Sequence, residues 1–357
     1  MLVTHVITDR EEFLALRPAW NELLQACPVC TLFITHAWLF NWWSHFGGTD
    51  ALRLVTLYDH NQLVGIAPLT LYKRRLSRLP VTVLGTFFNV HASRADFVIH
   101  PAYEATAMTA LAEYFSGTVR DWDLLMLRQL PAGTAHAIAH ACRGAGLNPF
   151  PLQPGAGKCY LQVNASWTDY LSTRTRHFRK RLKEHCRRPE KLGVTKYIRS
   201  VSHDSIEKDF ELLRSLELRS WKHQDDFAAM DARDWQFQKA MALSGSDGIG
   251  CENTFLALDD NIVAAVHSLS YAGVIYAFQM IYDERYRDAY LGRATFKYVL
   301  ESVWETGQYS VFDFNGNTPF CKSWTGNEYL FFDVQVFNAR PYSRSLAQLK
   351  TIRRWFK

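Results

Sequence analysis

The chain lacks a set of cysteines that would pair into a disulfide framework. Its 357 residues include seven cysteines, an odd number scattered from Cys27 to Cys321. Scattered cysteines are typical of a reducing compartment, so we expect a cytoplasmic protein. Cys27 and Cys30 form a lone CxxC pair, whereas a structural zinc site would need two further ligands at suitable spacing. We therefore predict two small buried residues at this position.

Long apolar runs are also missing. No stretch approaches the roughly 20 residues that span a bilayer, and residues 1–13 do not combine a basic region with an apolar run. We expect neither a membrane helix nor a signal peptide. His136 and His140 have the spacing of two metal ligands on a helix, but no third ligand is evident, so we predict no metal. The net charge of +5 is too small to indicate a DNA-binding protein.

What the chain does contain is enough apolar material for two cores, since 48% of its residues are hydrophobic. A first helix is predicted after Asp9, where Glu12 has the spacing of a capping box. The predicted elements that complete the first half are a helix at 36–46, a hairpin from 52–58 and 63–72, a strand at 81–87, a helix at 103–115 and a strand at 124–127.

The second half repeats this order. A hairpin leads to a strand, a helix and a strand, at 254–258 with 262–271, then 274–281, 294–306 and 310–314. Two such units predict one α/β (α+β) architecture used twice, with mixed central sheets. The Pro/Gly-rich segment 149–157 predicts a boundary between a domain at 1–150 and a domain at 151–357. Helices predicted within about 166–245 have no counterpart in the first half and indicate an insertion.

Several segments together resemble a known family. They are, in order, 33–39 with Trp42 and Trp43, 63–69, 179–182 with the later Gly193, 217–222, and 313–316 with 320–322. Their order and spacing are similar to those of the CelD-like GNAT acyltransferases and the FemAB-type tandem GNAT transferases. The resemblance implies two GNAT domains and the transfer of an acyl or aminoacyl group to an amine.

The resemblance also implies a site for the acyl donor. In the GNAT fold, a loop that enters a helix holds the pyrophosphate of acyl-CoA, because free N–H groups at a helix N-terminus bind anions. Residues 286–294 have this place in the second half, and Gly292 and Ala294 match the end of the family's motif. Arg287 and Arg293 are candidates to neutralise phosphate charge. The motif is incomplete, since Ala289 replaces the usual Gln or Arg, and the alternative is an ordinary loop.

The corresponding helix of the first half, after residue 101, has no glycine and carries Glu104. We therefore assign the first half to acceptor binding or to scaffold. Its polar segment 89–96 includes His91, Arg94 and Asp96, which we expect to contact the acceptor in a cleft between the halves. The alternative is a solvent-exposed loop.

Acyl transfer to an amine also needs a group that accepts the amine's proton. His267 is one candidate, because it lies on a hairpin strand of the second half and imidazole titrates near neutral pH; the alternative is a core histidine. Asp313 is another, because it ends the following strand; the alternative is a cap of the next turn. Lys322 matches the lysine of the family's closing motif and could hold a phosphate or carboxylate; the alternative is a surface lysine.

A long basic helix is predicted over about 167–188, and its residues 174–188 carry eight arginines and lysines against Glu184. This imbalance indicates an anionic partner, namely CoA phosphates, tRNA or a membrane surface. The tail 346–357 predicts a short basic amphipathic helix that packs on the core or contacts lipid.

Three functions follow from these patterns. The first is acyl-CoA-dependent N-acylation of a small amine or amino sugar. The second is aminoacyl-tRNA-dependent transfer, which the absence of sustained heptads for a coiled-coil arm disfavours. The third is a GNAT-like accessory protein without catalysis, which the incomplete donor loop favours.

Overall fold

The structure is a computed structural model, and it describes residues 2–27, 31–76, 78–92, 94–117, 121–224 and 229–355. The chain forms two compact units. Unit 1 combines residues 1–157 with 329–357, and unit 2 is residues 158–328. The CxxC segment lies mostly outside the described residues; Cys27 is partly exposed and its thiol donates to the carbonyl of Leu23 at 3.4 Å.

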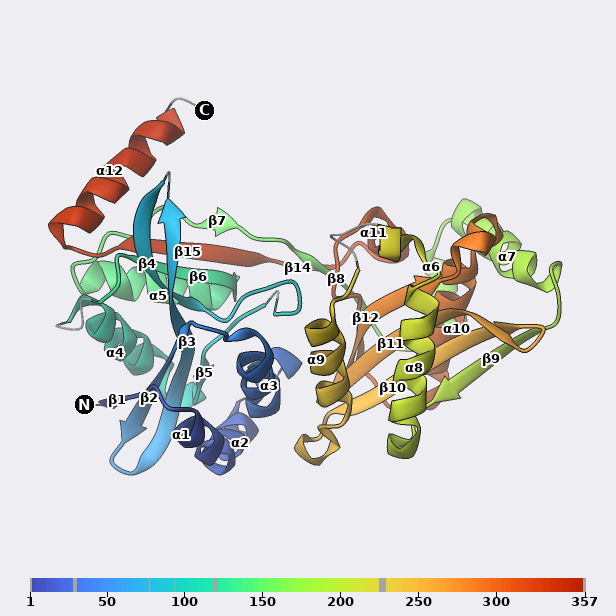
Figure 1. Cartoon of the computed structure of the whole chain (residues 1–357), viewed down its shortest axis with the longest axis horizontal. Coiled ribbons are helices and arrows are strands. Elements are labelled where there is room, and N and C mark those ends of the chain that lie inside the picture. The colour runs from blue at the N-terminus through green and yellow to red at the C-terminus, as the bar shows by residue number, and fades with distance from the viewer. Residues whose placement is uncertain are drawn as a thin grey trace. The chain divides into compact units, whose positions relative to one another are not determined.

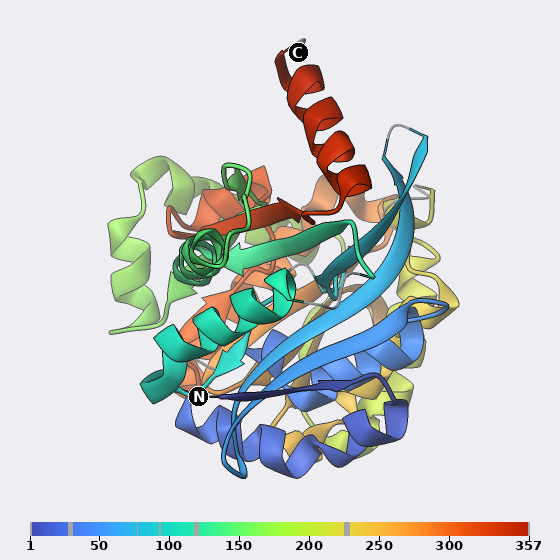
Figure 2. The same cartoon turned by 90° about the vertical axis from the view of Figure 1, so that its left-hand side faces the viewer.

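The sheet of unit 1 has the strand order β1-β2-β3-β4-β6-β15-β7, with β5 paired to β3. Neighbouring strands are antiparallel, except that β4 and β6 are parallel. Figure 2 shows β1, β2 and β3 side by side in this order. The strands are β1 (Val3–Ile7), β2 (Ala51–Asp59), β3 (Gln62–Leu76), β4 (Leu79–Thr86), β5 (Val98–Ile99), β6 (Leu124–Pro131), β7 (Gln153–Pro154) and β15 (Phe331–Phe337).

The helices of unit 1 are α1 (Arg10–Ala15), α2 (Arg17–Ala26), α3 (His36–Phe46), α4 (Glu104–Ser116), α5 (Ala132–Gly144) and α12 (Pro341–Trp355). Asp9 caps α1 by accepting from the N–H groups of Glu11 and Glu12. The single first helix that we predicted is two helices, because Pro18 cannot donate the backbone hydrogen bond that would continue α1. The predicted packing of the C-terminal helix on the core agrees with the burial of Leu346 against β4, β6 and β15.

The sheet of unit 2 has the strand order β14-β8-β13-β12-β11-β10-β9. From β8 to β9 in this order, neighbouring strands are antiparallel, except that β12 and β13 are parallel. Its strands are β8 (Lys158–Gln162), β9 (Thr195–Ser200), β10 (Gly250–Leu258), β11 (Asn261–Tyr271), β12 (Val274–Tyr282), β13 (Val311–Asp313) and β14 (Glu328–Tyr329). The edge strand β9 lies within the segment that we expected to be a purely helical insertion.

The helices of unit 2 are α6 (Trp167–Thr173), α7 (Arg176–Glu190), α8 (Ile206–Glu217), α9 (Ala232–Ala242), α10 (Leu291–Thr306) and α11 (Pro319–Trp324). In Figure 1, α8 and α9 lie on one face of the sheet and α10 on the other. The predicted basic helix is two helices, since the chain extends at Arg174 and Thr175 starts α7 by capping Phe178. No helix of the described residues is both long and apolar enough to cross a membrane.

The predicted repetition is confirmed by the order of the elements. In unit 1 a hairpin leads through β4, α4 and the parallel strand β6, and in unit 2 a hairpin leads through β12, α10 and the parallel strand β13. The boundary differs from the one predicted, because β15 pairs antiparallel with β6 and so returns to unit 1. In unit 2 the strand in the corresponding place, paired antiparallel with β13, is β8, which precedes the hairpin of unit 2 in the sequence.

Candidate functional site

The sheet of unit 2 opens in its middle. The residues that pair between β12 and β13 are Val274–Tyr276 with Val311–Asp313, while β12 continues to Tyr282. Residues 277–280 of β12 are all partly exposed, whereas residues 263–269 of the adjacent β11 are all buried. The second half of β12 is therefore accessible beside the buried strand β11.

The loop after β12 leads directly into α10. It forms a short 3-10 helix over Glu284–Ala289, and Tyr290 then takes a left-handed conformation with φ 56° as the N-cap of α10. No described side chain caps this helix start. Gly292 packs close to β12, since a Cβ there would lie 3.4 Å from the sulfur of Met280. The backbone of the first turn of α10 thus lies beside the opening.

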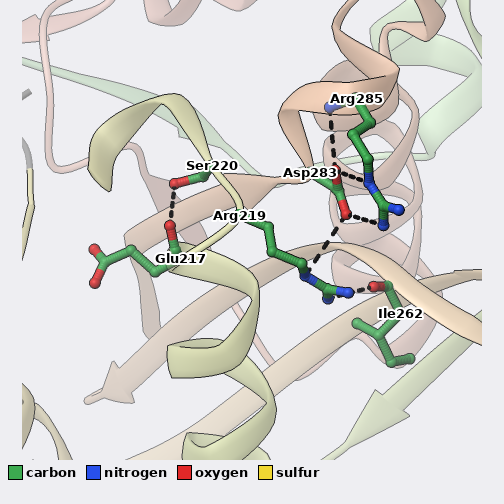
Figure 3. A network of polar contacts seen from close by, with 6 residues as sticks. All are labelled: Glu217, Arg219, Ser220, Ile262, Asp283 and Arg285. Carbon is green, nitrogen blue, oxygen red and sulfur yellow. Dashed lines mark hydrogen bonds and ion pairs between the residues drawn. The ribbon is translucent and has the colours of Figure 1, made fainter. Parts of the chain in front are cut away.

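A buried carboxylate fixes this loop. Asp283, at the end of β12, is 0% exposed and accepts from Arg285 Nη2 at 2.8 Å and Nε at 3.0 Å. Arg219, just after α8, lies 3.6 Å from the same carboxylate and donates to the carbonyl of Ile262 at 3.1 Å (Figure 3). Arg285 holds the pKa of Asp283 below its usual value through hydrogen bonds and charge. The network ties the loop to the end of α8 and to β11.

A basic pocket of about 1050 Å³ lies between α7 and the loop. Its walls carry six cationic side chains and two acidic ones, namely Lys180, Lys183, Arg187, Arg188, Lys191 and Arg285 with Glu184 and Asp288. The two walls are joined, because Arg188 donates to the carbonyl of Asp288 at 3.0 Å and His185 stacks on Tyr290 with 3.8 Å between ring centroids. The sequence identified the basic helix and the loop separately, and gave no sign that they share a pocket.

The family described as acetyltransferase (GNAT) domain matches residues 176–328. This range contains the opening, the loop, α10 and the whole lining of the basic pocket. It is a GNAT acetyltransferase domain. The match supports a transferase and places a GNAT domain within residues 176–328, in agreement with the family predicted from the sequence.

Solved structures extend the likeness to the whole chain. FemX is 12% identical with a TM-score of 0.62, covering 97% of this chain and 99% of its own. L-PGS from Bacillus licheniformis is 13% identical with a TM-score of 0.56, covering 96% of each chain. The C-terminal domain of a putative lysylphosphatidylglycerol synthetase from Agrobacterium fabrum is 12% identical with a TM-score of 0.55, covering 96% of this chain and 97% of that domain. At these identities the likeness establishes a shared fold. A search of curated protein sequences found no match.

The residues predicted for the donor loop of the GNAT domain come together at the start of α10. Gly292 and Ala294 are buried in its first turn. Arg293 donates to the hydroxyl of Ser323 at 3.0 Å. The pKa of Arg293 is lowered mainly by burial and further by the repulsion from Arg181. Arg287 is largely exposed and forms an ion pair with Glu284 at 3.3 Å. Thus Arg293 connects α10 to α11, while Arg287 faces solvent.

His267 of the GNAT domain lies inside the sheet and is 1% exposed. Its Nδ1 forms a 2.7 Å hydrogen bond with Asn253, which in turn donates to the carboxylate of Asp209 at 3.0 Å. Burial lowers the pKa of His267 to about 3, so the ring is neutral near pH 7. This placement corresponds to the core histidine that we gave as the alternative.

Asp313 and Lys322 lie close together in sequence but differ in exposure. Asp313 is 1% exposed, and its carboxylate accepts from the backbone of Asn315 at 2.7 Å. Because Asn315 has a φ of 48°, this contact caps the turn that follows β13. Lys322 is exposed on α11.

The candidates from the first half gather within unit 1. His91 is 7% exposed and stacks on Phe46. Arg94 is 6% exposed, with its guanidinium 4.8 Å from the ring centre of Phe33. Burial raises the pKa of Asp96 to about 6. The segment 89–96 is therefore largely packed, unlike the solvent-exposed loop that we gave as the alternative, and Ser93 within it lies outside the described residues. Among the residues that the structure describes, no group of three or more potential ligands could hold a metal.

Proposed function

We propose that this protein transfers an acyl group from acyl-CoA to the amine of a small molecule or amino sugar. The observation that carries the proposal is the opening at residues 277–280 of β12 beside the start of α10, within a GNAT domain. An extended donor can lie along this accessible strand edge. Backbone N–H groups at such an edge are suited to stabilise the oxyanion that develops on the reacting carbonyl.

In this proposal two groups of residues bind the phosphates of the donor. The N–H groups of the first turn of α10 attract anions, because the helix dipole is positive there. The basic pocket next to this turn supplies Lys183, Arg187 and Arg188 from α7 together with Arg285 from the loop. Gly292 and Ala294 keep bulky side chains out of the first turn of α10. Arg293 links this turn to α11 through its hydrogen bond to Ser323. Arg287 is a further phosphate contact, because its side chain is exposed in the same loop.

Unit 1 acts as scaffold in this proposal. Arg94 packs among aromatic rings of its own unit, including Phe33 and Phe331, with little surface exposed. His91 is similarly packed. We propose the cytoplasm as the place of action, because the scattered thiols suit a reducing compartment.

Aminoacyl-tRNA is the second candidate donor. The chain shares the fold of FemX over 97% of its length, and the name of another relative specifies a lysyl-bearing lipid. Six cations of α7 are exposed, namely Arg176, Arg179, Lys180, Arg181, Lys183 and Arg187. A solvent-facing row of cations matches a nucleic-acid backbone at least as well as a single CoA molecule.

Titration calorimetry with CoA and acyl-CoA tests the donor. Lys183→Glu with Arg187→Glu should weaken CoA binding more than tenfold, or about 1.4 kcal/mol, since two anions then face the phosphates. Lys208→Glu, an exposed change on α8, is the matched control and should bind normally. Normal CoA binding by the double variant contradicts the pocket. If CoA does not bind and transfer from aminoacyl-tRNA is abolished by RNase, the second donor is the correct one.

A further inference from the structure

Two titratable residues at the end of α8 take no part in the donor site. Lys222 follows the helix, and its Nζ donates to Gln279 Oε1 at 2.5 Å. Gln279 lies in the accessible half of β12. Lys222 thus brings an amino group to the opening of the sheet, from the α8 face. Gln279 also pairs with His267 across the strands, so Lys222 reaches the position where we had expected His267 to act.

Glu217 lies beside this amino group and is fixed in place. It is 5% exposed, and its two carboxylate oxygens accept from Trp235 Nε1 at 3.0 Å and from the backbone of Met230 at 3.4 Å. Burial raises the pKa of Glu217, while the bond from Trp235 and the charge of Lys222 lower it. In Figure 3 its carboxylate points away from the Asp283 network. The end of α8 therefore serves both the donor loop and a separate acid–base pair.

The surroundings of Lys222 favour a neutral amine. Burial lowers the pKa of Lys222 to about 8, and the charge of Glu217 opposes this shift. Gln279, which contacts Lys222 from β12, is uncharged, and the charge that acts on the pKa of Lys222 is that of Glu217. An amine that is partly neutral near pH 8 can accept a proton, which an ordinary surface lysine seldom does.

We propose that Lys222 is the general base of the acyl transfer, which rests on the proposed function. The neutral Nζ of Lys222 accepts the proton of the acceptor amine as the amine nitrogen forms a bond to the donor's carbonyl carbon. The tetrahedral intermediate then collapses, the bond from carbon to the leaving sulfur or oxygen breaks, and the new ammonium of Lys222 returns the proton to that atom. Glu217 is a positioning residue, whose carboxylate stabilises this ammonium between the two steps. Gln279 orients the amino group of Lys222 through its hydrogen bond.

The kinetic test compares kcat across pH for three variants. In the wild type, kcat should rise with pH and reach half its maximum near pH 8. Lys222→Met should lower kcat at least 100-fold and remove this inflection, while donor affinity stays unchanged because the pair lies outside the phosphate pocket. Lys222→Arg should lose activity similarly, since arginine stays protonated. Lys208→Met, at an exposed lysine of the preceding helix α8, is the matched control and should behave as wild type.

A second measurement does not depend on turnover. Competitive labelling with acetic anhydride, followed by mass spectrometry, should give Lys222 a pKa near 8, and a lower one in Glu217→Gln because a raising charge is removed. A labelling pKa near 10.4, the ordinary value for lysine, overturns the inference. So does an active Lys222→Met variant that keeps the inflection. If the wild type transfers from neither acyl-CoA nor aminoacyl-tRNA, the proposed function itself fails and the role of Lys222 fails with it.

Discussion

Replacement of Asp283 by asparagine removes a single negative charge and leaves the shape of the loop network intact. The carboxylate is fully buried and accepts two bonds from Arg285, at 2.8 and 3.0 Å, with Arg219 at 3.6 Å. It also accepts from the backbone N–H of Arg285 at 3.1 Å. An amide retains one acceptor oxygen, so the variant loses about half of these contacts.

The expected loss of stability follows from these contacts. A hydrogen bond to a charged group contributes about 1.5–3 kcal/mol. The side chains of Arg285 and Arg219 are 69% and 41% exposed, so water can solvate them once released, which places the loss at the lower end. We expect Asp283→Asn to reduce the free energy of unfolding by about 2 kcal/mol, or to lower Tm by about 4–8 °C for a domain of this size.

Urea denaturation of the full chain, followed by tryptophan fluorescence, measures this difference. The pKa of Asp283 is lowered in the folded state, so its contribution is complete above the unfolded pKa of about 3.9 and is lost as pH falls through the folded pKa. The two proteins should therefore differ at pH 7 and converge below about pH 4. Asp288→Asn, exposed in the same loop, is the control and should stay within about 0.5 kcal/mol. A similarly small change for Asp283→Asn would refute the reasoning.

Three further changes test other parts of the structure. Because the folded pKa of His267 is about 3, wild-type stability should fall by up to about 1.4 kcal/mol per pH unit below pH 6.5 relative to His267→Gln, measured by denaturation at pH 7 and pH 5. Gly193→Ala would place a methyl group against the Asp259 carboxylate, so we expect a loss of about 1–3 kcal/mol in thermal unfolding. Arg94→Met should destabilise the protein by about 1–2 kcal/mol and leave the acceptor KM unchanged. A raised KM with normal stability would instead restore Arg94 as an acceptor contact.

The sequence predicted best the features that depend on residues close together in the chain. The helix at 36–46 was predicted with its observed bounds, because Thr35 caps it by accepting from Trp38 and Gly47 follows its last residue. Both hairpins were found from their polar turns, where His60 and Asp260 have positive φ values. The break of the predicted basic helix after Thr173 was missed; there the chain extends at Arg174, and Thr175 caps α7 by accepting from Phe178.

Features that depend on distant partners were not predictable in the same way. Gln335 of β15 pairs with Met126 of β6, and nothing in the composition of either strand names the other. The basic pocket likewise depends on α7 packing on a loop about a hundred residues later. The segment 217–222 was identified as family-like, but the role of Lys222 depends on its contact with Gln279, which the spacing in the sequence does not indicate.

The return of β15 to unit 1 has a consequence for synthesis on the ribosome. Strand β6 emerges early, but its partner β15 follows only after all of unit 2, residues 158–328, has been made. Unit 2 can therefore close its sheet while the unit that began first still exposes a bare strand edge. Such edges promote aggregation, so the nascent chain is most vulnerable between the emergence of β6 and that of β15. The half that is translated first completes its fold last.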